Sequence, residues 1–178
     1  MRSPKTDPQR SRVYAWENQL TSWAGAHATA SQMRSMVDRC CKLYRVPTPP
    51  VRFVTKDKRN GRYLHSQYDP NTHDIVIRPR HMDLGSAIHE SAHAIVDYIL
   101  GPWGIAHGKE FLGVYLALLT KFKILPKSAL LAHAKTHRLA YCKMGTVGPK
   151  QIRKRFKAKV RSASRERKML RLWQRASA

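Results

Sequence analysis

The pattern of apolar positions in the first quarter of the chain predicts two helices. The apolar and aromatic positions are Val13, Trp16, Leu20 and Trp23 in a first set, and Met33, Met36, Val37, Cys40, Leu43 and Tyr44 in a second. Spacings of three and four residues place such side chains on one face of a helix, where they pack into a core. Gly25 is expected to separate the two helices, and the prolines of 46–50 end the second one.

Three short runs of β-type residues follow and predict a small sheet. The runs are "VRFVT" at 51–55, "GRYLHSQYD" at 61–69 and "HDIVIRP" at 73–79. The segments 58–61 and 69–72 between them carry residues that favour turns. Strands that follow one another through such short connections predict a meander.

Three further helices are predicted after the strands. Asp83 is suited to cap a helix that continues to about Leu100, where "GPWG" interrupts it. A second apolar helix covers about 108–122, and a third begins after Pro126 and reaches about Cys142. Helices on both sides of a small sheet in the chain indicate an α+β fold, in which the sheet packs on the helix at 83–100 and further helices flank it.

Charge sets the end of the chain apart from the rest. The 178 residues include 34 Lys and Arg but only 11 Asp and Glu, for a net charge of +23. Such an excess predicts a polyanionic partner, with nucleic acid first and an anionic membrane surface second. Composition divides the chain into a flexible arm at 1–10, a folded domain at 11–142, a linker at 143–149 and a basic segment at 150–178. Nonspecific contact with nucleic acid is expected through Lys150–Arg175.

Other features of composition predict a soluble, cytoplasmic protein. The three cysteines form no CxxC pair, which favours reduced thiols. The N-terminal residues lack an apolar signal segment, and no apolar run reaches the length of a membrane span. The chain therefore has no predicted transmembrane segment.

The helix predicted at 83–100 carries the pattern H-E-x-x-H. His89 and His93 are four residues apart, so their imidazoles lie on one helix face and two of their nitrogens can bind the same Zn²⁺. Glu90 is offset around the helix and can reach a water molecule next to the metal. The pattern predicts a catalytic zinc site with Glu90 as the general acid and base.

A third protein ligand is needed, and two residues are candidates. The break at "GPWG" lets the chain return its next helix towards the metal, with His107 at its start and Gly108 allowing close approach. Glu110 is the alternative, because some zinc proteases take a glutamate from the following helix. The interval after His93 is short for that arrangement, which favours His107. A histidine six residues after His93, as metzincins require, is absent because Ile99 occupies that position.

The sequence "HESAH", followed after a gap by "HGKEF", resembles the SprT-like metallopeptidase family, with its HExxH and HGxxF motifs. That family includes Spartan-type proteases of DNA–protein crosslinks and phage-encoded members. The resemblance covers about 60–125 and implies a zincin-like domain, with His89, His93 and His107 as zinc ligands and Glu90 as the catalytic residue. Many relatives end in a four-cysteine zinc ribbon, whereas this chain has a basic segment there.

Other residues are candidates for supporting roles. Asp97 could orient a ligand imidazole, or be solvated or a cap. An oxyanion could be stabilised by Tyr98, Lys109 or Tyr115. The strand at 73–79 could offer its edge to an extended substrate, but a strand in the domain core has the same pattern. His133 and His137 are also four apart, but without a glutamate between them they favour an ordinary amphipathic helix.

The predicted function is that of a zinc-dependent metallopeptidase that hydrolyses peptide bonds in protein or peptide substrates near nucleic acid. The small size and the basic segment suit a phage-encoded relative, which would act in the host-cell cytoplasm. The alternative is a noncatalytic protein that binds nucleic acid or belongs to a virion, in which the zinc site only stabilises the fold.

Overall fold

The computed structural model describes residues 7, 9–21, 27–56, 58–59, 62–101, 106–142 and 154. The helices within these ranges are α1 (Arg10–Thr21), α2 (Ala30–Tyr44), α3 (Leu84–Leu100), α4 (Lys109–Lys121) and α5 (Lys127–Thr136), with a 3-10 turn η1 (Pro79–His81). The strands are β1 (Val51–Phe53), β2 (Lys58–Arg59), β3 (Arg62–Tyr63), β4 (Gln67–Asp69) and β5 (Asp74–Ile77). The protein is thus a mixture of helices and small sheets, as the α+β prediction requires at this coarse level.

The three-stranded sheet is not the meander that the sequence suggested. Its order is β1-β5-β4, with β5 parallel to β1 and antiparallel to β4. The predicted strand at 61–69 is divided between β3, which pairs only with β2 in a separate ribbon, and β4. Because β5 is the central strand and all four of its residues are buried, it has no edge to offer to a substrate. Of the two alternatives for 73–79, the structure shows the core strand. The sequence could not decide between them, since a buried central strand and an edge strand can share the same apolar run.

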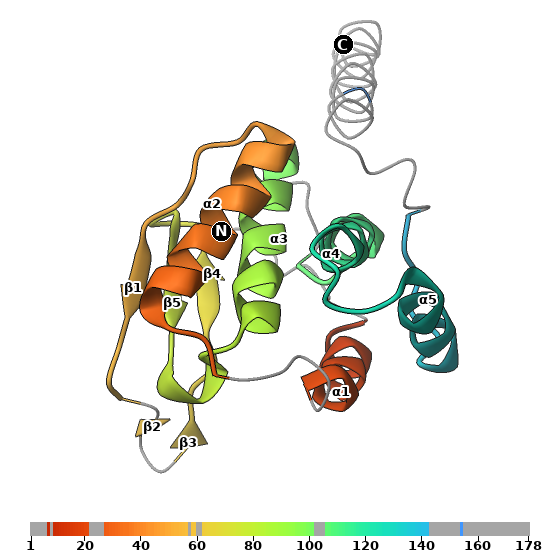
Figure 1. Ribbon diagram of the computed structural model, residues 1–178, viewed down its shortest axis with the longest axis horizontal. Coiled ribbons are helices and arrows are strands. Elements are labelled where there is room, and N and C mark those ends of the chain that lie inside the picture. Colours follow the sequence, from red (N-terminus) through yellow and green to blue (C-terminus); the bar gives the residue numbers. More distant parts are fainter. Residues whose placement is uncertain are drawn as a thin grey trace, which may run out of the picture.

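Helix α3 is the centre of the molecule. Figure 1 shows the sheet on one side of α2 and α3, with α4, α1 and α5 on the other side. Asp83 caps α3 as predicted, because its carboxylate accepts hydrogen bonds from the backbone N–H of Ser86 at 2.8 Å and from the Ser86 hydroxyl at 2.7 Å. Most of the helix is buried, and Ile88 and Ile95 are wholly inaccessible to solvent. A helix that is apolar on nearly all sides packs between other elements.

The remaining helices agree with the apolar pattern except at one end. α2 begins with a capping box between Thr29 and Gln32 and ends at Tyr44, before the prolines. Helix α5 stops at Thr136 and not near Cys142, because Arg138 adopts a left-handed conformation with φ 51°. The chain then runs back along α4, where the backbone N–H of Cys142 donates to the carbonyl of Lys109 at 3.0 Å.

The structure describes only part of the predicted N-terminal arm, linker and basic segment. Residues 143–149 lie outside the described residues, and so does the basic segment apart from Lys154. From the predicted flexible arm, Asp7 and Gln9 are described, and Gln9 is only 5% exposed. None of the described helices is both long enough and apolar enough to span a membrane.

Candidate metal centre

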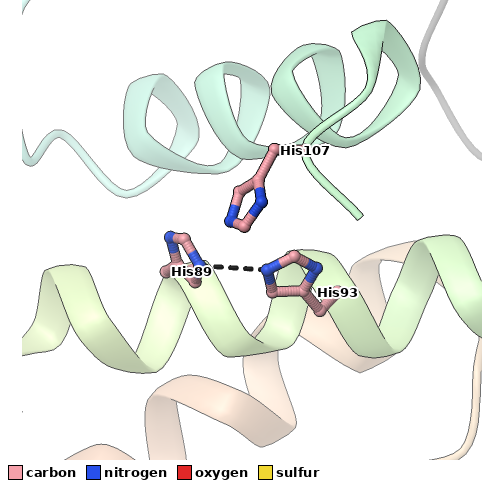
Figure 2. A group of neighbouring side chains, drawn as sticks. All are labelled: His89, His93 and His107. Carbon is pink, nitrogen blue, oxygen red and sulfur yellow. Dashed lines mark hydrogen bonds between the residues drawn. The ribbon is translucent and has the colours of Figure 1, made fainter. Parts of the chain in front are cut away.

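Three histidine side chains converge between α3 and α4. His89 and His93 project from successive turns of α3, and His107 projects towards them from the residues just before α4 (Figure 2). One ring nitrogen from each histidine lies within 4.8 Å of the other two, and the Nε2 atoms of His89 and His93 are 3.0 Å apart. His89 and His107 are buried, whereas His93 is partly exposed. This cluster could hold a metal ion.

His107 enters the cluster from the turn that precedes α4. The next residue, Gly108, is the N-terminal cap of α4, it is buried, and its carbonyl accepts the backbone N–H of Leu112 at 3.0 Å. The helix thus begins directly after the third histidine.

Carboxylates hold two of the imidazoles by their other ring nitrogen. The Nδ1 atom of His89 is hydrogen-bonded to Glu17 in α1. The Nδ1 atom of His107 lies 2.6 Å from the Asp7 carboxylate, which belongs to the segment before α1. A carboxylate at Nδ1 keeps the proton on that nitrogen when the ring is neutral and leaves the Nε2 lone pair for a metal.

A metal ion would satisfy the ring nitrogens of the cluster better than hydrogen bonds between the rings do. His107 Nε2 is buried and has no hydrogen-bond partner among the described residues. A buried polar atom without a partner is costly, and a metal ion would satisfy it. Three imidazoles also form the set of protein ligands found in some catalytic zinc sites. The residues present therefore fit a transition metal ion.

Gln9 fastens the segment that carries Asp7. Its side-chain amide donates to the carbonyls of His107 and Ala140, both at 3.1 Å, and its side-chain oxygen accepts the Ala140 N–H at 2.6 Å. One buried side chain thus joins the beginning of the described chain to the start of α4 and to the end of the domain. These bonds hold Asp7 next to His107.

Aromatic side chains surround the imidazoles. Phe111 stacks on His93 with ring centroids 4.2 Å apart, and Tyr115 meets the edge of His89 at 5.3 Å. Tyr14 in α1 lies 5.2 Å from His107, ring to ring. Since these rings exclude water from the interior side of the cluster, they strengthen the electrostatic interactions within it.

Glu90 lies beside the cluster with its carboxylate in a defined position. It is 5% exposed, and its Oε2 accepts the backbone N–H of Tyr68 in β4 at 2.7 Å. Burial raises the pKa of Glu90, while the charge of His89 and the Tyr68 hydrogen bond act in the opposite direction. The hydrogen bond from β4 therefore fixes the position of the Glu90 carboxylate.

The three imidazoles differ in their affinity for protons. Burial lowers the pKa of His93 well below the usual value and also lowers that of His107, so both rings are neutral at pH 7. Burial acts in the same direction on His89, but the carboxylates of Glu17 and Glu90 outweigh it and raise the pKa to about 9. Without a metal, His89 is thus an imidazolium ion whose Nε2 donates to His93.

A cleft of about 310 Å³ gives access to the three histidines and to Glu90. One wall of the cleft is formed by Gln67 and Tyr68 of β4 and by Ser66, which precedes the strand. Because β4 is the last strand of its sheet among the described residues, the cleft lies along the outer edge of a strand, where the Tyr68 N–H bonds Glu90. An extended chain could occupy it.

The other candidate residues lie elsewhere or act differently. Glu110 is not part of the cluster and is half-buried in the first turn of α4. Asp97 accepts a hydrogen bond from the Tyr68 hydroxyl at 3.0 Å and lies 3.6 Å from His73 Nδ1, so it holds these two side chains and not a ligand imidazole. Tyr98 is 58% exposed and Lys109 is exposed too. Tyr115 is buried, and burial together with the nearby Glu17 carboxylate raises the pKa of its hydroxyl well above the usual value.

Three residues of the site were not predicted from the sequence, namely Glu17, Asp7 and Tyr14. Glu17 had a signal, because it is four residues after Val13 and therefore lies on the apolar face of α1. An acid on a buried face needs a partner, and a histidine cluster is an obvious one. Asp7 stands among polar residues and prolines and had no such signal.

His133 and His137 do not form a second cluster within the described part of the chain. Their rings stack at 6.5 Å, and His137 Nε2 lies 3.0 Å from the side-chain oxygen of Gln19. The pair joins α5 to α1, in keeping with the prediction of an ordinary helix.

Comparison of the chain with protein-family models, with curated proteins and with solved structures found no match.

Replacing Glu17 with glutamine tests whether this carboxylate orients His89. Glu17→Gln should weaken metal binding by about 10- to 100-fold, because the ring loses its charged partner at Nδ1. Zn²⁺ affinity measured by competition with a chelator would show the change. Glu110→Gln makes the same chemical change outside the cluster and should leave the affinity as it is. Equal affinities for both variants would contradict the role of Glu17.

The raised pKa of His89 predicts that metal binding displaces a proton. At pH 7 the metal-free protein holds this proton, and its stabilising effect is present at low pH and lost as the pH rises through about 9. Zn²⁺ binding should release about one proton, and the affinity should rise about tenfold per pH unit between 7 and 9. Calorimetry in buffers of different ionisation enthalpy measures the proton count. A release of no proton at pH 7 would contradict the charge assigned to His89.

Proposed function

We propose that the protein is a zinc-dependent metallopeptidase. The observation that carries the proposal is the convergence of three imidazoles beside the buried carboxylate of Glu90, at the wall of an open cleft. Zinc is the preferred metal because it accepts three histidine ligands and keeps a further position for water. The resemblance of "HESAH" and "HGKEF" to the SprT-like motifs points to the same chemistry.

A zinc ion held by His89, His93 and His107 would supply a Lewis acid that lowers the pKa of water and polarises a peptide carbonyl. Glu17 and Asp7 would hold two of these imidazoles in the orientation that binding requires. Because all three imidazoles are neutral when they bind, the ligands add no negative charge to the site.

Glu90 would take a proton from the attacking water and give it to the amine that leaves. The Tyr68 N–H already bonds one oxygen of this carboxylate and keeps it in the cleft. Burial raises its affinity for a proton, which suits a group that must receive one and release it in the same reaction.

We place the substrate along β4, in an extended conformation. β4 forms the wall of the cleft and lies at the edge of its sheet, in contrast to the central strand β5. Backbone hydrogen bonds to a strand edge recognise a peptide without regard to its sequence. The cleft would thus take a protein segment that is unfolded or exposed.

Nucleic acid is the partner that we propose for the basic segment. Residues 149–178 contain twelve Lys and Arg and one acid, Glu166. Contacts from such a segment to phosphates are nonspecific and sensitive to salt. The segment would bring the peptidase close to proteins that are bound to nucleic acid.

The substitution Glu90→Gln separates catalysis from metal binding. The variant should bind zinc as the wild type does, and its proteolytic rate should fall by at least about 10²- to 10⁴-fold, because the proton acceptor is lost. Cleavage of an unfolded protein and of a DNA-crosslinked protein would be followed by gel electrophoresis, with zinc content measured on the same samples.

Two results would overturn the proposal. Purified protein that takes up no stoichiometric zinc would remove the basis for the enzyme. Zinc-loaded wild type and Glu90→Gln that behave alike on both substrates would favour the noncatalytic alternative, in which the metal stabilises the fold.

Removal of the residues after Gly148 tests the proposed binding of nucleic acid. The shortened protein should bind DNA more weakly, and the slope of log affinity against log salt should become shallower by about 0.9 for each phosphate that the basic segment neutralises in the full-length protein. Fluorescence anisotropy at several salt concentrations gives the slope. An unchanged slope would contradict the role of the segment.

A further inference from the structure

A second cavity opens next to the metal centre. It has a volume of about 210 Å³ and shares Tyr14, Ser66, His89 and Glu90 with the outer cleft. A peptide in the cleft would therefore pass the mouth of this cavity at the place where Glu90 acts. Because the cavity and the cleft adjoin, one side chain of such a peptide could enter the cavity.

Most of the surface of the cavity wall is apolar, although polar side chains such as Asn18 and Ser86 and three carboxylates also line it. The aliphatic and aromatic part comes from α1, α4 and the turn after α4, and consists of Leu20, Tyr115, Leu119, Ile124 and Leu125. Leu20, Tyr115 and Leu119 are buried, and the other two are partly buried. Three further rings line the cavity, where Tyr14 stacks with His65 at 5.8 Å and His65 lies 5.7 Å from His81.

The carboxylates in the wall already have partners. Glu17 bonds His89, Asp83 bonds Ser86, and Glu90 bonds the backbone of Tyr68. A lysine or arginine side chain that entered would lose water and find these groups engaged, which is unfavourable. An apolar side chain would instead gain from leaving water.

The volume decides which apolar side chains fit. An apolar protein cavity of roughly 150 Å³ is large enough for benzene. The cavity of about 210 Å³ therefore has room for the ring of phenylalanine or for the branched chain of leucine. Alanine would leave most of it empty.

From these observations we propose that the cavity selects substrates with a large apolar residue, such as phenylalanine or leucine, at one fixed position beside the bond that is cut. The proposal rests on the proposed peptidase function and names its substrate class. The apolar side chain fills the cavity while the backbone of the same segment lies along β4. The specificity of the enzyme then comes from α1 and α4, and its chemistry from α3.

The first experiment compares peptides with the full-length, zinc-loaded protein. A mixture of peptides of diverse sequence is digested, and the cut sites are read by mass spectrometry. One position next to the cut should be enriched in phenylalanine, leucine and methionine. For matched peptides, alanine at that position should lower kcat/KM about 10- to 200-fold. Cleavage with no preference, or with a preference for lysine or arginine, would overturn the proposal.

The second experiment changes the cavity. Leu125→Trp fills it from a partly buried position and should reduce cleavage of the phenylalanine peptide relative to the alanine peptide. Leu125→Ala enlarges it and should extend the preference to tryptophan. Leu43→Trp, at a position that is 39% exposed on α2, is the matched control and should cleave as the wild type does. A selectivity that stays the same in both Leu125 variants, with zinc content unchanged, would refute the assignment.

A binding measurement separates the cavity from the catalysis. Matched peptides with phenylalanine or alanine at the position next to the cut are labelled with a fluorophore. Their affinities for the wild type and for Glu90→Gln are then measured by titration. If the wild type cuts no peptide but both proteins bind the phenylalanine peptide more tightly, the peptidase function fails and the cavity stands as a site for an apolar side chain. If both peptides bind equally, the cavity assignment fails whatever the outcome for proteolysis.

Discussion

The structure depends on how the two nitrogens of each buried imidazole are satisfied. His89 and His107 have one nitrogen next to a carboxylate and the other directed into the cluster. Two of the three rings are thereby fixed from outside, and burial leaves His107 Nε2 with no partner among the described residues. A cluster of this kind is stable in the interior only if its polar atoms are paired or hold an ion. The packing at the candidate metal centre thus requires that these nitrogens be paired or hold an ion.

Helix α1 and the segment before it supply the carboxylates that hold two of the imidazoles. Both carboxylates come from α1 and from the residues before it, and Val13 and Trp16 anchor that helix with no exposure to solvent. Gln9 then ties the same segment to the carbonyls of His107 and Ala140. Because a bound metal would draw on ligands from α3 and from the start of α4, its binding energy would also hold these elements together. Folding and metal binding would then be coupled through α3 and the start of α4, whose imidazoles Glu17 and Asp7 hold.

The sequence was informative where local spacing determines geometry. His89 and His93 had to share a face of α3, and the break after Leu100 allowed His107 to return, so the ligand cluster could be predicted from short segments. The sheet order could not be predicted, because the parallel pairing of β1 with β5 joins residues that are more than twenty positions apart. Glu17 could have been identified from its place on the apolar face of α1. Asp7 could not, since its contact with His107 joins residues that are 100 positions apart and its own segment has no periodic pattern.

Helix α1 contacts both the histidine cluster and the second cavity. Glu17 bonds His89 on the metal side, while Tyr14 and Leu20 of the same helix line the second cavity. A shift of α1 would change the direction of the His89 ring and the width of the cavity together. Since packed interiors transmit small displacements, a side chain that fills the cavity would press on the helix that orients a ligand. In the proposed peptidase, the geometry of the metal site and the choice of substrate would in this way be linked mechanically through Glu17.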